Sequence, residues 1–140
     1  MQLTVLDRSN YLKGLLILIG KDKKITEDER ELFLRLSKVL GFNKKFCDDA
    51  INELSENEYI IEEPPLFSDR KIAEAFLKDC MRLAFLDKDL HLYELNWIKS
   101  TGEKNNISLE WRVNEFEKIK NVSLPPDSEF EICQLLHDSE

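Results

Sequence analysis

The chain has 140 residues, with 28 acidic against 20 basic side chains, a net charge of −8 and a pI near 4.9. This length suits one domain, and a chain of this size buries enough surface to fold without a disulfide or a structural metal. The negative charge excludes broad binding to nucleic acids or anionic membranes, because phosphate groups are held by clusters of lysine and arginine.

The first half of the chain shows the periodicity of helices. Apolar residues at helical spacing from Tyr11 onward, with an unbroken apolar run over Leu15–Ile19, predict a first helix that is buried nearly all round and ends near Gly20. Thr26 and Glu29 have the spacing of a capping box, in which the hydroxyl and the carboxylate each satisfy a free amide at a helix start. A second helix is therefore expected to begin here and to run to Gly41.

A third helix follows in the first half. Asn43 is the expected N-cap, because its side chain can accept a hydrogen bond from a free amide of the first turn. The predicted apolar face of this helix consists of Phe46, Cys47, Ala50, Ile51 and Leu54. Residues 55–67 contain Pro64 and Pro65 and no repeat, so we expect a surface crossover.

The second half of the chain predicts four more helices. Ser68 is the expected cap of a long fourth helix, and a fifth helix is expected from Leu92 to Glu103. Ser108 is the expected cap of a sixth helix, and the range Asp127–His137 predicts a final one. No stretch has the alternating pattern of a strand bounded by turn signals. The sequence therefore predicts an all-α single domain of about seven helices.

An internal repeat carries the strongest functional signal. Shifting the chain by 65 residues places Leu16 on Met81 and Asp22 on Asp87. We therefore expect two similar three-helix halves, residues 8–54 and 68–120, related by a pseudo-twofold axis and followed by the C-terminal helix.

The corner between two helices is the most specific part of each copy. Both corners have the pattern Asp-x-x-(Ile/Leu)-x-x-x-Glu, with Asp22 and Glu29 in the first and Asp87 and Glu94 in the second. The glutamate lies in the first turn of a helix, where the helix dipole favours a negative charge. The aspartate follows the unfavourable end of the preceding helix, so it needs a compensating partner: the free amides of the next helix, a nearby lysine, or a bound cation.

These corners resemble those of the TerB-like family, all-helical proteins associated with tellurite resistance, whose fold is shared with the N-terminal region of the DjlA co-chaperones. The family motif, Ala-Asp-Gly-x-(Ile/Val)-x-x-x-Glu, occurs twice. The matching positions of this chain are Asp22, Ile25, Glu29 and Arg30, then Ala84, Asp87, Leu90 and Glu94. The resemblance covers roughly residues 10–120. It implies an all-helical fold and a divalent-metal site at Asp22, Glu29, Asp87 and Glu94.

One departure from the family motif bears on that metal site. Lys23 and Lys88 stand where the family has glycine, so both turns lose the residue that most easily adopts a positive φ. Each lysine also places a positive charge beside the aspartate with which a cation would pair.

Two interpretations of the four carboxylates remain open. Oxygen ligands from two Asp–Glu pairs suit a hard cation, Ca²⁺ or Mg²⁺. Alternatively, Glu29 completes the capping box with Thr26 and both aspartates cap the following helices. An EF-hand is excluded, because positions six and twelve counted from Asp87 are Leu92 and Ile98 rather than glycine and glutamate.

The remaining chemistry-bearing residues predict structural roles. His91 has no partner visible in the sequence and is expected to be a polar residue at a helix start. Trp97 and Trp111 lie at helical spacing within apolar patterns and are expected to pack in or beside the core.

The three cysteines, Cys47, Cys80 and Cys133, lack metal-ligand spacing. We expect buried, reduced thiols, which favour a cytoplasmic location.

These features predict a non-enzymatic, TerB-like binding or scaffold module associated with stress, which has protein partners and binds a divalent cation at the corners. A metal-independent protein–protein adaptor is the alternative, and it predicts an exposed apolar patch with the four acids engaged in caps. A metal-dependent hydrolase using the same carboxylates is the third possibility, although the sequence contains no Gly-rich phosphate loop, no GxSxG and no HExxH motif.

Overall fold

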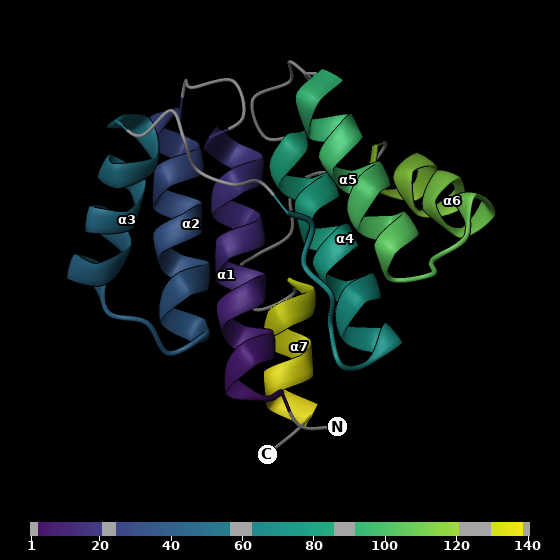
Figure 1. Cartoon of the computed structure of the whole chain (residues 1–140), viewed down its shortest axis with the longest axis horizontal. Helices are drawn as coiled ribbons and strands as arrows, with labels where there is room; N and C mark the ends of the chain where they lie inside the picture. Colours follow the sequence, from purple (N-terminus) through teal and green to yellow (C-terminus); the bar gives the residue numbers. More distant parts are fainter. Residues whose placement is uncertain (1–2, 21–24, 57–62, 86–91, 121–129, 139–140) are drawn as a thin grey trace.

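The computed structural model describes residues 3–20, 25–56, 63–85, 92–120 and 130–138 (Figure 1). Within these ranges the regular elements are seven helices and no strand, so the predicted all-α class is confirmed. The helices are α1 (Val5–Gly20), α2 (Glu27–Val39), α3 (Lys44–Glu56), α4 (Arg70–Ala84), α5 (Leu92–Lys104), α6 (Leu109–Lys120) and α7 (Glu131–Asp138). None of these described helices combines the length and the apolarity that a bilayer crossing requires.

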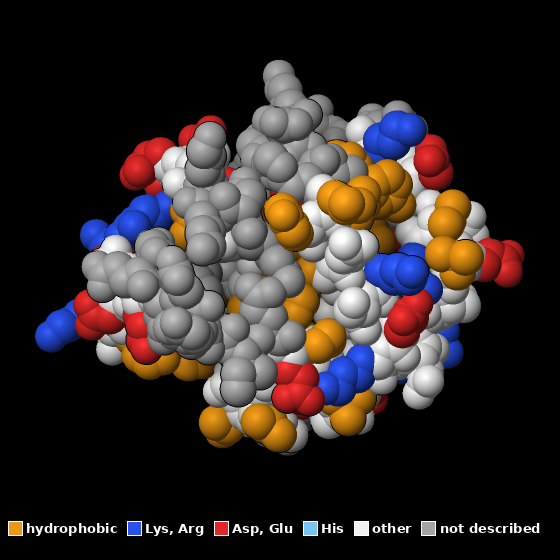
Figure 2. Space-filling view, turned by 45° about the horizontal axis from the view of Figure 1, so that its top comes forward, with side chains coloured by type: hydrophobic (Ala, Val, Ile, Leu, Met, Phe, Trp, Pro, Cys, Tyr) orange, Lys and Arg blue, Asp and Glu red, His pale blue; other side chains and the backbone are white. Residues whose placement is uncertain are grey.

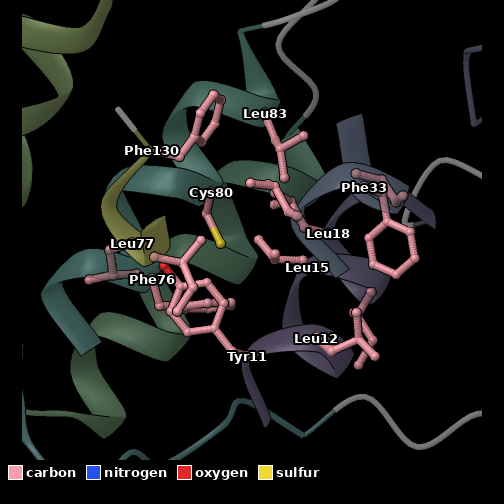
Figure 3. Close-up of a cluster of buried hydrophobic side chains, with 14 of the residues drawn as sticks. Tyr11, Leu12, Leu15, Leu18, Phe33, Phe76, Leu77, Cys80, Leu83 and Phe130 are labelled. Atoms are coloured by element: carbon pink, nitrogen blue, oxygen red, sulfur yellow. The ribbon is translucent and has the colours of Figure 1, made fainter. Parts of the chain in front are cut away.

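Helices α1 and α4 lie side by side at the centre of the molecule (Figure 1). Helices α2 and α3 pack against α1 on one side, and α5 and α6 pack against α4 on the other. The short α7 packs on α4 and also contacts α2. The main core forms where these layers meet, and Figure 3 shows Tyr11, Leu15, Leu18, Phe76 and Cys80 gathered in it, with Phe130 at its edge. Burial of these side chains is the main stabilising contribution.

Three predicted helix starts are confirmed by their hydrogen bonds. Thr26 and Glu29 form the reciprocal capping box of α2. The Asn43 side chain accepts from the amide of Phe46 at 2.8 Å. The Ser108 hydroxyl accepts from the amide of Trp111 at 3.1 Å. Each cap joins residues three apart, so each can be predicted from local sequence.

The predicted cap of α4 is wrong by one residue. Asp69, not Ser68, is the N-cap, and its carboxylate accepts from the amide of Lys71 at 2.8 Å. The backbone amide and hydroxyl of Ser68 instead donate to Asp7, at 3.0 and 2.6 Å. The buried Asp7 carboxylate needs these donors, because an unpaired buried charge is costly.

Helix α1 begins earlier than its apolar run. Thr4 and Asp7 form a reciprocal pair: the Asp7 amide donates to the Thr4 hydroxyl at 3.0 Å, and the Thr4 amide donates to the Asp7 carboxylate at 3.3 Å. This pair acts as a capping box with aspartate in the place of glutamate. The described part of α1 reaches Gly20, and residues 21–24 lie outside the described ranges, so the predicted C-terminus at Gly20 stays a prediction.

The predicted apolar face of α3 is partly wrong. Cys47 and Ile51 are buried, but Phe46 is 53% exposed and Ala50 is half-buried. Helix α3 is an outer helix whose main described contacts are with α1 and α2, so its buried stripe is narrow and Phe46 lies beyond it. The side chain of Leu54 lies outside the described residues.

The final helix was predicted over Asp127–His137. The described α7 begins at Glu131 and ends at Asp138, and residues 127–129 lie outside the described ranges. The predicted crossover at residues 55–67 also differs at its start, because α3 continues to Glu56. Its described end is held by Asn105, whose side chain donates to the Pro65 carbonyl at 2.8 Å and accepts from the Phe67 amide at 2.9 Å.

Candidate functional site

The four helix ends that flank the two predicted corners lie at one end of the bundle (Figure 1). The end of α1 and the start of α2 flank the first corner, and the end of α4 and the start of α5 flank the second (Figure 1). All four helix ends point in the same direction, and α1 packs against α2, α4 and α5. Asp22 and Asp87 lie outside the described residues, whereas Glu29 and Glu94 lie within them.

Glu29 is a capping residue at the start of α2. Its carboxylate accepts from the backbone amide of Thr26 at 3.1 Å, and the Thr26 hydroxyl accepts from the amide of Glu29 at 3.1 Å. Glu29 is only 3% exposed. Its carboxylate therefore has a structural role, as the capping interpretation of the sequence predicted for this residue.

Glu94 occupies the equivalent position in the first turn of α5 and is only 4% exposed. It lies close enough to Cys80 on α4 for its negative charge to contribute to a raised thiol pKa there, after the larger effects of burial and of Asp79. Both corner glutamates are thus turned inward rather than toward solvent. Within the part of the chain that the structure describes, neither belongs to a group of three or more metal-ligating side chains.

A further buried carboxylate, Asp79 on α4, was not singled out from the sequence. It is fully buried and accepts hydrogen bonds from the Tyr11 hydroxyl at 2.6 Å and from the backbone amides of Glu131 and Ile132 at 2.9 and 3.1 Å. The Arg82 guanidinium lies 3.3 Å from it and also 3.2 Å from Glu131. Asp79 therefore caps the N-terminus of α7 and ties this helix to α1 and α4.

Burial controls the ionisation of this cluster. It raises the pKa of Asp79 from 3.8 to about 6, although the hydrogen bonds and the charge of Arg82 act in the opposite direction. Burial and the neighbouring Asp79 charge raise the pKa of Tyr11 well above 10.0. The sequence contained one signal for Asp79, because its position on the helical wheel of α4 lies on the same face as the buried Phe76 and Leu83.

Asp7, near the N-terminus of α1, likewise joins two helix starts, those of α1 and α4. Its carboxylate joins Thr4 to Ser68, the residue before the N-cap of α4. Burial acts to raise its pKa, but the hydrogen bonds from Ser68 and Thr4 outweigh burial and hold the pKa below 3.8. The buried aspartates of the described chain thus connect helix ends, which is a structural use of charge.

The expected structural roles of the tryptophans and of two cysteines are confirmed. Trp97 is buried and donates from Nε1 to the Gly14 carbonyl at 3.1 Å, while Trp111 packs beside the core. Cys47 and Cys80 are buried, and burial raises both thiol pKa values. Cys133 is only half-buried, which differs from the expectation; all three cysteines are free thiols. His91 lies outside the described residues.

An apolar groove lies between α1 and α3, on a face that the sequence did not predict. It has a volume of about 310 Å³ and is lined by Ser9, Leu12, Lys13, Leu16, Phe42, Phe46 and Ala50. The rings of Phe42 and Phe46 stack with their centroids 5.6 Å apart and an interplanar angle of 19°. The surface that this groove presents to solvent is apolar.

No protein-family model, curated protein or solved structure matches this chain.

Proposed function

We propose that the chain is a non-enzymatic, TerB-like binding module that holds an amphipathic helix of a partner protein in the groove between α1 and α3. The observation that carries this proposal is the exposure of Phe46, stacked on Phe42, at the mouth of an apolar groove. Exposed aromatic side chains beside a pocket are typical of the anchors of protein interfaces.

The shape of the groove supports a helical occupant. Helices α1 and α3 form its two walls, and Leu16 and Phe46 are among its lining residues. Such a trough accepts the apolar stripe of an amphipathic helix, whose anchors recur at positions i, i+3, i+4 and i+7.

The positive charge at the groove favours a partner helix that carries an acidic residue beside its apolar stripe. Lys13 lines the groove and is exposed. No ion pair joins Lys13 to a carboxylate of the described residues. A partner helix that places an aspartate or glutamate opposite Lys13 would pair with this charge and set its own orientation in the groove.

Site-specific photo-cross-linking of the full chain tests this proposal. Benzoylphenylalanine is placed at position 46 and, as a matched control, at Leu109, an exposed apolar position on α6. After irradiation in an extract of the source organism, we expect position 46 alone to yield a cross-linked peptide with an amphipathic helical pattern and an acidic residue beside its apolar stripe.

Three results would contradict the proposal: no product from position 46, the same products from both positions, or products without the amphipathic pattern. Cross-linking only to a second copy of this chain would show that the groove mediates self-association and would also contradict the proposal. Light scattering of the purified protein would then show a dimer.

A divalent cation at the two corners is a second candidate function, and a separate observation favours it. Glu29 and Glu94 hold the same position in the first turns of α2 and α5, and the helix ends that flank the two corners lie at one end of the bundle. Carboxylates from Asp22, Glu29, Asp87 and Glu94 would provide the oxygen ligands that Ca²⁺ or Mg²⁺ requires. Such an ion would join the two halves of the bundle at this end.

Calorimetric titration of the chelator-treated protein with Ca²⁺ and Mg²⁺ tests the cation site. We expect saturable binding below millimolar metal that is lost in Asp22→Asn and in Asp87→Asn. The matched control is Asp28→Asn, which removes an exposed charge from the first turn of α2 without altering the corner motif. Absence of saturable heat, or equal binding by all variants, would exclude this site and leave the docking proposal untouched.

A further inference from the structure

A second groove lies on the other side of the molecule, between α5 and α6 and over α4. It has a volume of about 370 Å³ and is open to the surface. Its lining is Met81, Leu95, Ile98, Lys99, Arg112, Val113, Phe116 and Glu117. The side of the molecule that carries α5 and α6 exposes hydrophobic side chains with lysine or arginine side chains among them (Figure 2). The volume and the apolar lining are those of a small-ligand site.

Arg112 is the residue that gives this groove a chemical preference. Its Nε is buried and has no hydrogen-bond partner, which is rare for a guanidinium donor. No ion pair joins Arg112 to any carboxylate of the described residues, although the chain carries an excess of eight acidic side chains. Arg112 therefore brings to the groove a positive charge that no carboxylate of the described residues pairs.

Close packing against α5 fixes the position of Arg112. A Cβ at Gly102 would lie 2.6 Å from the Arg112 Cδ and 3.0 Å from its Nε, so only glycine allows the arginine stem to lie there. The stem is thus confined between the two helices before any ligand binds. A donor that is already positioned loses less conformational entropy on binding.

Aromatic contacts hold the α6 wall of the groove on α4. The rings of Phe85 and Phe116 lie with their centroids 5.0 Å apart. The Lys78 ammonium lies 5.9 Å from the centre of the Trp111 ring, a cation–π contact. These contacts hold α6 against α4 without the help of a ligand.

We propose that this groove binds an amphiphilic carboxylate, with its anionic head group on Arg112 and its acyl chain along Met81, Leu95 and Phe116. A carboxylate is the natural partner of a guanidinium, because two parallel N–H groups match its two oxygens. Lys99, which lines the same groove and is exposed, adds a second positive charge for the head group.

Glu117 also lines the groove, but its negative charge does not prevent a carboxylate from binding at Arg112. Glu117 lies more than one helical turn along α6 from Arg112. The Lys120 ammonium lies 3.8 Å from the Glu117 carboxylate and offsets its charge. The end of the groove near Arg112 therefore favours an anion. This groove shares no lining residue with the groove between α1 and α3.

Titration of the isotope-labelled full chain with sodium decanoate, followed by amide chemical shifts, tests the proposal. We expect saturable shifts at groove residues such as Leu95, Val113 and Phe116. Decanol has the same chain without the charge and is expected to bind at least roughly tenfold more weakly, because it forms no charge-assisted hydrogen bond.

Three variants test the head-group assignment. Arg112→Gln is expected to weaken decanoate binding by roughly tenfold or more, whereas Lys118→Gln on the same helix is expected to leave it unchanged. Val113→Glu, at a position 50% exposed and therefore tolerant of a polar side chain, is expected to abolish binding by repelling the carboxylate.

The proposal is wrong if decanoate shifts no amide of the groove, or if decanol binds as tightly as decanoate. Wild-type affinity in folded Arg112→Gln or Val113→Glu protein, as judged by circular dichroism, would equally overturn it. A fall in affinity in Lys118→Gln as large as that in Arg112→Gln would show a general charge effect and would also contradict the assignment.

Discussion

Replacing Asp79 with alanine is expected to destabilise the folded chain by about 3 kcal/mol or more, the range observed when a buried charged acceptor is removed. The substitution leaves the Tyr11 hydroxyl and the amides of Glu131 and Ile132 without their acceptor. Urea unfolding followed by circular dichroism measures the effect. Asp69→Ala is the matched control, because it removes an exposed N-cap of the same helix and is expected to cost about 1 kcal/mol.

Asp79 also gives the stability of the protein a pH dependence of definite sign. Because its pKa is raised from 3.8 to about 6 on folding, the folded state binds the proton more tightly than the unfolded state. The free energy of unfolding therefore falls as pH rises from about 4 to about 6, and this contribution stays lost at higher pH. The difference between wild type and Asp79→Asn is expected to change in this direction across that window, whereas a difference that is flat with pH would contradict the account.

Gly14→Ala is expected to destabilise the chain by about 1–3 kcal/mol, against the gain of about 1 kcal/mol that alanine normally gives within a helix. A Cβ at Gly14 would overlap Cζ of Phe76 and would lie 2.8 Å from its Cε2. That ring is fully buried and packs against Tyr11 and Phe67, with centroids 5.1 Å away in each case, so it has no room to move.

A double-mutant cycle checks the cause of the Gly14 effect. Phe76→Leu removes the atoms that the new Cβ would meet, so Gly14→Ala is expected to cost less in the Phe76→Leu background than in the wild type. Thermal unfolding of the four proteins provides the measurement. A stabilised Gly14→Ala protein, or costs that simply add, would show that α1 and α4 do not approach each other at this point as closely as described.

Local sequence predicted the features of the fold that depend on neighbouring residues. The capping box of Thr26 and Glu29 and the caps at Asn43 and Ser108 each join residues three apart, and all three are found. The helical periodicity was likewise sufficient for the all-α class. In these cases the partner of each polar group lies within the same turn of the chain.

Features that depend on distant partners were not predictable in the same way. Ser68 bonds to Asp7, 61 residues away, and therefore does not cap α4. Asp79 bonds to the amide of Ile132, 53 residues away, so its role as a cap for α7 is not apparent from its own neighbourhood. Phe46 has the helical spacing of a core residue, but the peripheral position of α3 leaves it exposed.

The same contrast between local and distant partners applies to the candidate sites. The positions of Glu29 and Glu94 at helix starts followed from the repeat, and both are found there. The groove between α1 and α3 and the groove at Arg112 each combine residues from separate helices. Their existence depends on which helices pack together, and periodicity alone contains no such information.

The most direct test of the central claim, docking of a partner helix between α1 and α3, is the dissociation constant of the peptide recovered by cross-linking at position 46. Fluorescence anisotropy of this labelled peptide would be measured with wild type, Phe46→Ser and the control Leu109→Ser. We expect Phe46→Ser to weaken binding by about 30-fold, the loss of one aromatic anchor, and Leu109→Ser to bind as the wild type does. Equal affinities for all three folded proteins would contradict the claim.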